Sequence, residues 1–194
     1  MAPTELHPEA GATLLPLARA TIARELGRPQ NADESAPWLQ APGACFVTLT
    51  QQGELRGCIG SLEAHRALLA DVKANALAAA FRDPRFAPLA AHELDHTEVE
   101  ISLLSPMQAL SFDSEAEALA QLRPGIDGLV FEFGARRSTF LPQVWEQLPE
   151  VQDFMAQLKR KAGLPASFWH GEVRLQRYTV AKWKESELRL ADAA

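Results

Sequence analysis

The chain has 194 residues, of which 47% are hydrophobic and 23% charged, a balance typical of one folded globular domain. Its net charge of −6 does not favour nucleic-acid binding, because phosphate binding needs a concentrated positive field. The first residues lack a basic segment followed by an apolar run, and no stretch approaches the roughly 20 apolar residues that span a bilayer, so the sequence predicts a cytoplasmic protein without a membrane partner. Both cysteines are then expected to be reduced. Two short basic clusters, 136–137 and 159–161, are interpreted as solvated surface.

Hydrophobic spacing and chain-breaking residues predict the elements of the first half. A helix is expected up to Leu26, and it either starts near Thr13 or is kinked at Pro16. A loop over residues 28–43 follows. The next expected elements are strands at Cys45–Thr50 and Leu55–Gly60 and a helix at His65–Phe81.

In the second half, strands and helices mix without regular alternation. Ser114 with Glu117 forms a capping box that opens a short helix ending near Leu122. The other expected elements are strands at Glu98–Leu104, Leu129–Phe133, Ser138–Leu141 and Glu172–Trp183, and helical stretches at Gln143–Leu148 and Val151–Ala162. The pattern predicts an α+β fold, with a mainly antiparallel sheet flanked by helices.

The strand Leu55–Gly60 contains two glycines, which usually mark a bulge or a close backbone approach. A three-residue loop over 51–53 pairs Leu49 with Leu55, which places Leu55 and Ile59 on the apolar face. Strand alternation then turns Cys58 to the opposite face, beside Arg56.

Cys58 has two interpretations. A guanidinium two residues away favours the thiolate, which is the nucleophilic form of cysteine. A small buried cysteine between glycines is the alternative, since free cysteine is among the most buried residue types. Cys45 lies on the core-facing side and is expected to be inert, with no bond between the two thiols.

Charged residues after the second helix also have two interpretations. Asp83 follows the helix end, and Pro84 forces the chain out of helical geometry. The group is either structural, with Asp83 accepting backbone amides and Arg85 pairing with Glu100, or it lines a cleft. Glu100 and Ser102 share the polar face of their strand.

Residues His92–His96 read H-E-x-x-H, the pattern of a zinc peptidase. That chemistry needs both histidines on one helix face and a third ligand, and the short stretch before Glu98 leaves little room for such a helix. We expect no metal and no other cofactor. Known nucleotide-binding loops are absent from the sequence as well.

Several blocks follow one another in an informative order: Gly53–Gly60, Asp83–Phe86, Glu98–Ser102, Gly125–Gly128, Leu141–Val144 and Lys161–Pro165. Together they resemble the AMMECR-type domain family (AmmeMemoRadiSam system protein A). The resemblance covers about residues 12–184 of a single domain, 1–194. The resemblance implies a larger part containing both termini, a smaller lobe, and a cleft between them to which Gly53–Gly60 contributes. It also implies Memo-like and radical S-adenosylmethionine (SAM) partners, with no established reaction.

The favoured hypothesis is a binding or scaffold module whose cleft receives a small molecule or a peptide, because no set of nucleophile, base and oxyanion donors is recognisable. The alternative is an enzyme that uses Cys58 of the Leu55–Gly60 segment. The expected cleft residues are Arg56, Gly57, Gly60, Asp83, Arg85, Phe86, Glu100 and Ser102, with Cys58 as the candidate catalytic residue.

Overall fold

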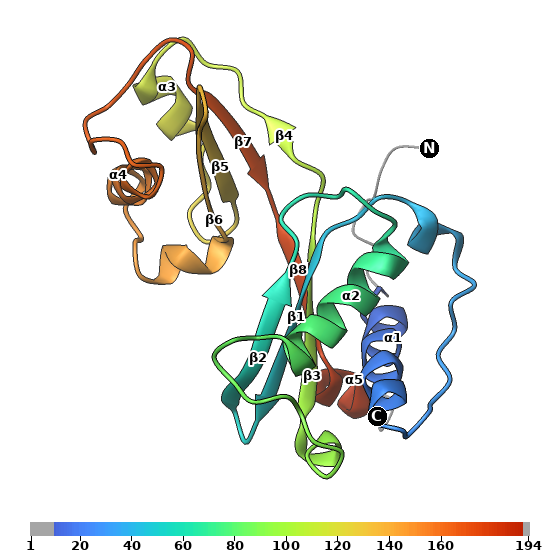
Figure 1. The fold of residues 1–194 in the computed structure, drawn as a ribbon. Coiled ribbons are helices and arrows are strands. Elements are labelled where there is room, and N and C mark those ends of the chain that lie inside the picture. The colour runs from blue at the N-terminus through green and yellow to red at the C-terminus, as the bar shows by residue number, and fades with distance from the viewer. Residues whose placement is uncertain (1–9, 192–194) are drawn as a thin grey trace. The chain divides into compact units, whose positions relative to one another are not determined.

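The computed structural model describes residues 10–191, which divide into two compact units. One unit consists of the described residues up to Pro106 together with those from Ala181 on, and the other is Met107–Val180. None of the helices within 10–191 is long and apolar enough to cross a lipid bilayer. Figure 1 shows the elements of both units, which contain one four-stranded sheet each. The fold is therefore α+β, as the sequence predicts, but the expected single sheet is two.

The first unit packs helices on one face of a sheet with strand order β2-β1-β3-β8 (Figure 1). Strand β1 pairs antiparallel with both β2 and β3. Its helices α1 and α2 contact each other and the sheet. The bounds are α1 Ala10–Glu25, η1 Pro37–Gln40, β1 Cys45–Gln51, β2 Glu54–Gly60, α2 Leu68–Phe81, η2 Leu94–His96, β3 Glu98–Leu104, β8 Val180–Lys184 and α5 Glu185–Ala191.

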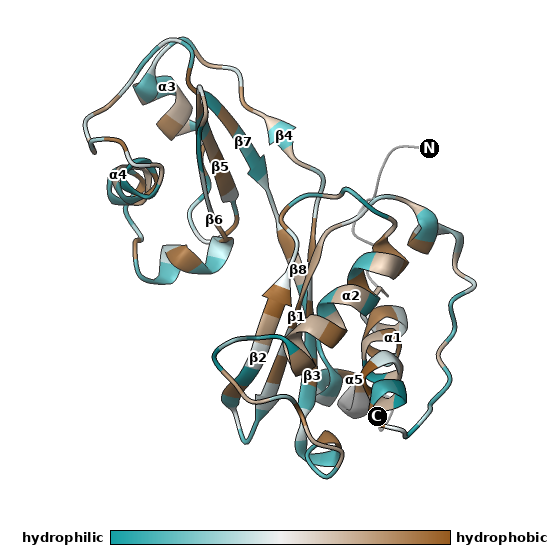
Figure 2. Cartoon of the chain, viewed as in Figure 1, coloured by the Kyte–Doolittle hydropathy of each residue, from teal (hydrophilic) through white to brown (hydrophobic). Residues whose placement is uncertain are grey.

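The core of this unit lies between the helices and one face of the sheet. Alternate residues of β1 and β3 are fully or almost fully buried there, including Cys45, Val47 and Ile101. Figure 2 colours much of α1, α2 and β1 as hydrophobic, and the loop between α1 and η1 as mainly hydrophilic. Period-two burial on the strands leaves the other sheet face to polar residues. Pro16 lies inside α1, which starts earlier than the predicted Thr13.

A buried carboxylate ties α2 to the sheet. Asp71 on α2 is fully buried and accepts the backbone N–H of Cys45 at 2.9 Å. It also accepts hydrogen bonds from Ser61 at 2.7 Å, Arg66 at 2.8 Å and Asn75 at 2.9 Å. A buried charge is tolerated when it is paired and fully hydrogen-bonded. This network fixes the helix beside the strands that carry the candidate site.

The second unit has a sheet with strand order β4-β7-β5-β6. Helices α3 and α4 and the turn η3 contribute to its separate core, in which Trp145 stacks on Phe154 with ring centroids 3.7 Å apart. Ser114 caps α3 by accepting the N–H of Glu117, as the capping box predicts. The bounds are β4 Gln108–Ala109, α3 Glu115–Ala120, β5 Gly128–Phe133, β6 Arg136–Phe140, η3 Pro142–Glu146, α4 Val151–Lys161 and β7 Arg174–Tyr178.

Two predictions about these elements are wrong. The expected strand Glu172–Trp183 is two strands, β7 and β8, which belong to different sheets. Lys159, expected on the solvated surface, is only 1% exposed. Its ammonium group pairs with Glu115 and lies over the ring of Trp169, 5.5 Å from the ring centre. A lysine can be buried when an opposite charge compensates for lost hydration.

Candidate functional site

The hairpin between β1 and β2 has a tighter turn than expected. Gln52 and Gly53 both have positive φ, 52° and 84°, which is the geometry of a two-residue turn rather than the predicted three-residue loop. Thr50 pairs with Leu55 and Leu49 with Gly57, so Arg56 has no partner on β1 and is the extra residue of a β-bulge.

The bulge corrects the predicted register in part. The predicted pairing of Leu49 with Leu55 is wrong, and Leu55 is 40% exposed instead of lying in the apolar layer. The extra residue restores the expected alternation further along, because Val47 faces Ile59 and Thr48 faces Cys58. Bulges re-aim side chains, and here the affected side chain is that of Arg56.

Arg56 is held by Glu93 in a two-pronged ion pair. Its Nε and Nη2 donate to the two carboxylate oxygens at 3.0 and 3.1 Å. Glu93 also accepts from the N–H of Ala90 at 2.8 Å and from the Gln51 amide at 3.2 Å. These donors, Arg56 first, lower the pKa of Glu93 to about 2. The third nitrogen of Arg56, Nη1, is buried without a hydrogen-bond partner, and the guanidinium lies 6.0 Å from the centre of the Phe86 ring.

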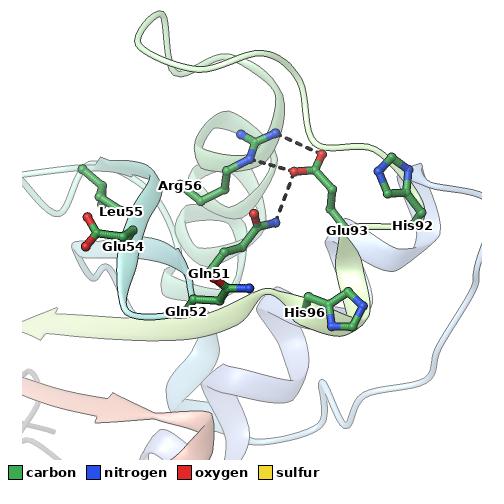
Figure 3. Close-up of a pocket in the computed structure, with 8 residues that line it drawn as sticks. All are labelled: Gln51, Gln52, Glu54, Leu55, Arg56, His92, Glu93 and His96. Carbon is green, nitrogen blue, oxygen red and sulfur yellow. Dashed lines mark hydrogen bonds and ion pairs between the residues drawn. The ribbon is translucent and has the colours of Figure 1, made fainter.

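This ion pair lines a pocket of about 410 Å³, which we call the Arg56 pocket (Figure 3). Residues of the hairpin form one side of it, and the segment before β3 forms the other. The lining residues are Gln51, Gln52, Glu54, Leu55, Arg56, His92, Glu93 and His96. The pocket thus combines hydrogen-bonding side chains, a fixed ion pair and one exposed leucine.

The H-E-x-x-H segment does not have the geometry of a zinc peptidase. Leu94–His96 is a short 3-10 turn, and Glu93 is turned toward Arg56 while the two imidazole rings lie apart (Figure 3). Asp95 is paired with Arg28 at 3.0 Å. Within residues 10–191, no three side chains of His, Cys, Asp or Glu are grouped so that they could hold a metal ion.

The Asp83–Arg85 pair occupies the outer edge of β2. Asp83 accepts the backbone N–H of Cys58 at 2.9 Å, and Arg85 donates to the Cys58 carbonyl at 3.3 Å. The two side chains are joined at 2.7 Å, and hydrogen bonds from Arg85 hold the pKa of Asp83 well below its usual range. The predicted acceptance of backbone amides by Asp83 is therefore confirmed. The predicted pairing of Arg85 with Glu100 is wrong.

Gly57 marks a close approach of the protein to itself. A Cβ atom at this position would lie 2.2 Å from the carbonyl oxygen of Ala79 on α2. The predicted close backbone approach is thus confirmed at Gly57, and the approaching group is the helix. At Gly60, a Cβ would meet the ring of Phe46 on β1 at 2.2 Å. Both glycines let neighbouring elements pack tightly on β2.

Cys58 lies on the sheet face opposite the aliphatic core, in agreement with its predicted alternation. Its Sγ atom contacts the Thr48 hydroxyl at 3.3 Å. Thr48 also faces Glu100 of β3, so the three residues form one row across the sheet. Glu100 is flanked at 3.5 Å by the ammonium groups of Lys182 and Lys184. In the next row, Phe46 lies between Gly60 and Ser102.

The expected site residues therefore form two neighbouring groups. Arg56 lines the pocket, and Phe86 lies near both Arg56 and Arg85, whose guanidinium is 5.5 Å from the ring centre. Cys58, Asp83 and Arg85 meet at the edge of β2, while Glu100 and Ser102 lie on β3, on the other side of β1. None of Cys58, Asp83, Arg85, Glu100 and Ser102 lines the Arg56 pocket.

Sequence reasoning missed Glu93 as the partner of Arg56 and Gln51 as a further donor to Glu93. In the sequence, Glu93 stands in the position of the base of an H-E-x-x-H metal site, a pattern that does not indicate an ion pair with Arg56. A carboxylate shortly before a strand, in a segment rich in polar residues, is too common a pattern to identify the partner of a distant arginine.

Comparisons with known proteins agree with this fold. The AMMECR1 family model matches residues 15–183. A protein of Methanothermobacter thermautotrophicus is 36% identical over 93% of this chain and 96% of its own length, and one of Methanocaldococcus jannaschii is 36% identical over 93% and 92%. A crystal structure described as an uncharacterized protein of Pyrococcus horikoshii superposes with a TM-score of 0.73, at 29% identity, covering 91% of this chain and 92% of the other.

These matches define an α+β protein of the AMMECR class, and the family match extends over nearly the whole sequence. The chain belongs to the AMMECR1 family.

Proposed function

We propose that this protein is a binding module that receives a segment of a partner protein in the Arg56 pocket. The observation that carries the proposal is the exposed Leu55 beside a pocket whose guanidinium is held in place by Glu93. An exposed apolar side chain next to a fixed polar group is the combination that anchors protein segments, because burial of the first adds affinity and the second sets orientation.

The polar lining suits a peptide backbone. Gln51 and Gln52 supply amide groups, and His92 and His96 supply ring nitrogens, which together offer donors and acceptors to N–H and C=O groups. Gln52 has a positive φ that only a few per cent of non-glycine residues adopt, and it lines the pocket. Strained backbone that is held by its surroundings is often found at ligand sites.

Memo-like and radical SAM proteins are the partners to test first, since the family resemblance suggests them. A scaffold that holds two such proteins together needs contact surfaces and no catalytic group of its own. The proposed role is consistent with the surroundings of Cys58, whose sulfur contacts only the Thr48 hydroxyl among the hydrogen bonds of residues 10–191.

The alternative, an enzyme that uses Cys58, has one supporting observation. The Arg85 guanidinium donates a hydrogen bond to the Cys58 carbonyl at 3.3 Å, so a cation lies beside this residue. A nucleophilic cysteine also needs a group that accepts its proton. Arg56, the cation expected from the sequence, is engaged by Glu93 instead.

Calorimetry with the full chain and the purified Memo-like and radical SAM proteins of the same organism tests the proposal. We expect one of them to bind, and Leu55→Glu to weaken binding at least about tenfold, which is about 1.4 kcal/mol. Ile126→Glu is the matched control, since Ile126 is the other large hydrophobic residue exposed in the described part of the chain.

The control should leave the affinity unchanged. If neither protein binds, or if Leu55→Glu binds as tightly as Ile126→Glu, the pocket is not the contact surface and the proposal is wrong.

A further inference from the structure

The second unit carries a groove that has no part in the Arg56 pocket. Two hollows of about 580 and 540 Å³ lie along α3 and the start of α4. Both are lined by Ala116, Leu119 and Gln152, so they form one continuous depression. We call it the α3–α4 groove.

The floor of the groove is mainly apolar. Leu119 and Leu122 contribute from the α3 side, and Val151 and Pro149 contribute from the α4 side. Leu119 and Val151 are only partly buried by the core of this unit, so part of their apolar surface remains available to a ligand. Removing such apolar surface from water favours binding.

The accessible charge in the groove is negative. Lys159 is the one cation among its lining residues, but its side chain is only 2% exposed and its ammonium group is paired with Glu115 and bonded to the Ala166 carbonyl at 3.1 Å. Glu150 is exposed at the other end of the groove. Glu115 remains one-third exposed. A ligand therefore meets apolar surface and the exposed carboxylate of Glu150, while the charges of Lys159 and Glu115 compensate each other.

We propose that the α3–α4 groove binds a partner-protein segment in which apolar residues alternate with lysine or arginine. Apolar residues cover Leu119 and Val151, and a basic residue lies against Glu150, the exposed carboxylate of the groove that Lys159 does not engage. Charge complementarity selects this occupant over an acidic segment, because like charges across an interface are unfavourable. This surface and the Arg56 pocket belong to different units, so the chain has two separate contact points.

Fluorescence anisotropy with three labelled 14-residue peptides tests the proposal on the full chain. All three carry leucine at every second position, and the remaining positions are lysine, glutamate or serine. We expect the lysine peptide to bind at least about tenfold more tightly than the glutamate peptide. Its affinity should fall as salt is raised from about 0.05 to 0.5 M, because exposed charges are screened.

Variants locate the binding. Leu119→Arg should weaken the lysine peptide at least about tenfold. Because Leu119 also packs on the core, Glu150→Lys gives a second test at an exposed position, with about a threefold loss expected. Glu172→Lys makes the same charge change at an exposed position of the same unit outside the groove, and it should have no more than a small effect.

Three results would overturn the proposal: equal binding of the lysine and glutamate peptides, equal losses in Glu150→Lys and Glu172→Lys, or no binding at about 100 µM peptide. Sedimentation provides a further check. A dimer that Leu119→Arg dissociates would identify the occupant as a second copy of the chain and contradict the partner proposal. Leu55→Glu should leave peptide binding intact, which separates this test from that of the Arg56 pocket.

Discussion

The two cysteines differ in their surroundings although both belong to the same hairpin. Cys45 is fully buried, and burial raises the pKa of its thiol, with the nearby Asp71 carboxylate adding to the effect. Cys58 is half-buried on the opposite sheet face, and both thiols are free. Only the thiolate is reactive, so burial protects Cys45 twice, by excluding the reagent and by keeping the proton.

Native protein treated with N-ethylmaleimide should therefore gain one label, at Cys58, and a second at Cys45 only after unfolding. Intact-mass and peptide mass spectrometry distinguish the two. Cys58→Ser should give no label in the native state. Labelling of Cys45 at the rate of Cys58 would show that the hairpin opens far more readily than this packing permits.

Gly57 is required by packing. We expect Gly57→Ala to lower the free energy of unfolding by about 1–3 kcal/mol, the usual cost of overpacking, because the added Cβ meets a backbone oxygen that cannot move aside cheaply. Gly171 is the matched control, since its Cβ would meet nothing within 4 Å and its φ is not in the left-handed region. Urea unfolding of both variants checks this. Equal stability of the two would contradict the close approach of α2.

At the scale of elements, the strand β2 forms the edge of its sheet, and edge strands present unpaired backbone groups that invite other chains. Asp83 and Arg85 satisfy both groups of Cys58, as a residue of a neighbouring strand would do. The Asp83–Arg85 pair therefore protects this edge from pairing with another strand. It also fixes the backbone of Cys58, the candidate catalytic residue.

Removing this cover should be visible in amide exchange. Asp83→Ala should speed hydrogen exchange of the Cys58 amide at least about tenfold, whereas the Val47 amide on the central strand β1 should stay protected. Arg85→Ala keeps the acceptor of the Cys58 amide and should have the smaller effect. Faster exchange at both amides alike would indicate unfolding of the whole sheet rather than exposure of its edge.

At the scale of the whole molecule, the ion pairs around β2 predict how the stability depends on pH. Arg56 lowers the pKa of Glu93 from its usual 4.5 to about 2, so the carboxylate stabilises the folded chain above the unfolded-state pKa. That contribution is lost as the pH falls from about 4.5 through 2, where the folded state too becomes protonated.

Glu93→Gln should therefore be less stable than the unaltered protein at pH 7, and the difference should shrink steadily below pH 4.5. Urea midpoints measured from pH 7 to 2 follow this. Glu54→Gln is the control, because Glu54 lines the same pocket and the structure gives it no ion pair. A pH-independent difference between Glu93→Gln and the unaltered chain would argue against the ion pair.

Local pattern accounts for much of the fold. The α+β class, the capping box at Ser114 and the side of the sheet that carries Cys58 follow from spacing, because side-chain direction in a strand depends only on alternation. The predicted turn length is wrong because the bulge at Arg56 lets a two-residue turn place Ile59 on the apolar face as well. A three-residue loop without a bulge and a two-residue turn with one fit the same hydrophobic pattern equally well.

Sequence alone determined that β2 carries a glycine-flanked cysteine away from the core, in a chain whose ordered blocks identify its family. Tertiary structure decided which charges meet. Glu93 lies 37 positions from Arg56, and Asp83 lies 25 from Cys58. Side chains so far apart in sequence are brought together only when α2 and the loop after it fold back along β2. The pairing of a charge depends on distances of a few ångströms in space, which composition and periodicity do not encode.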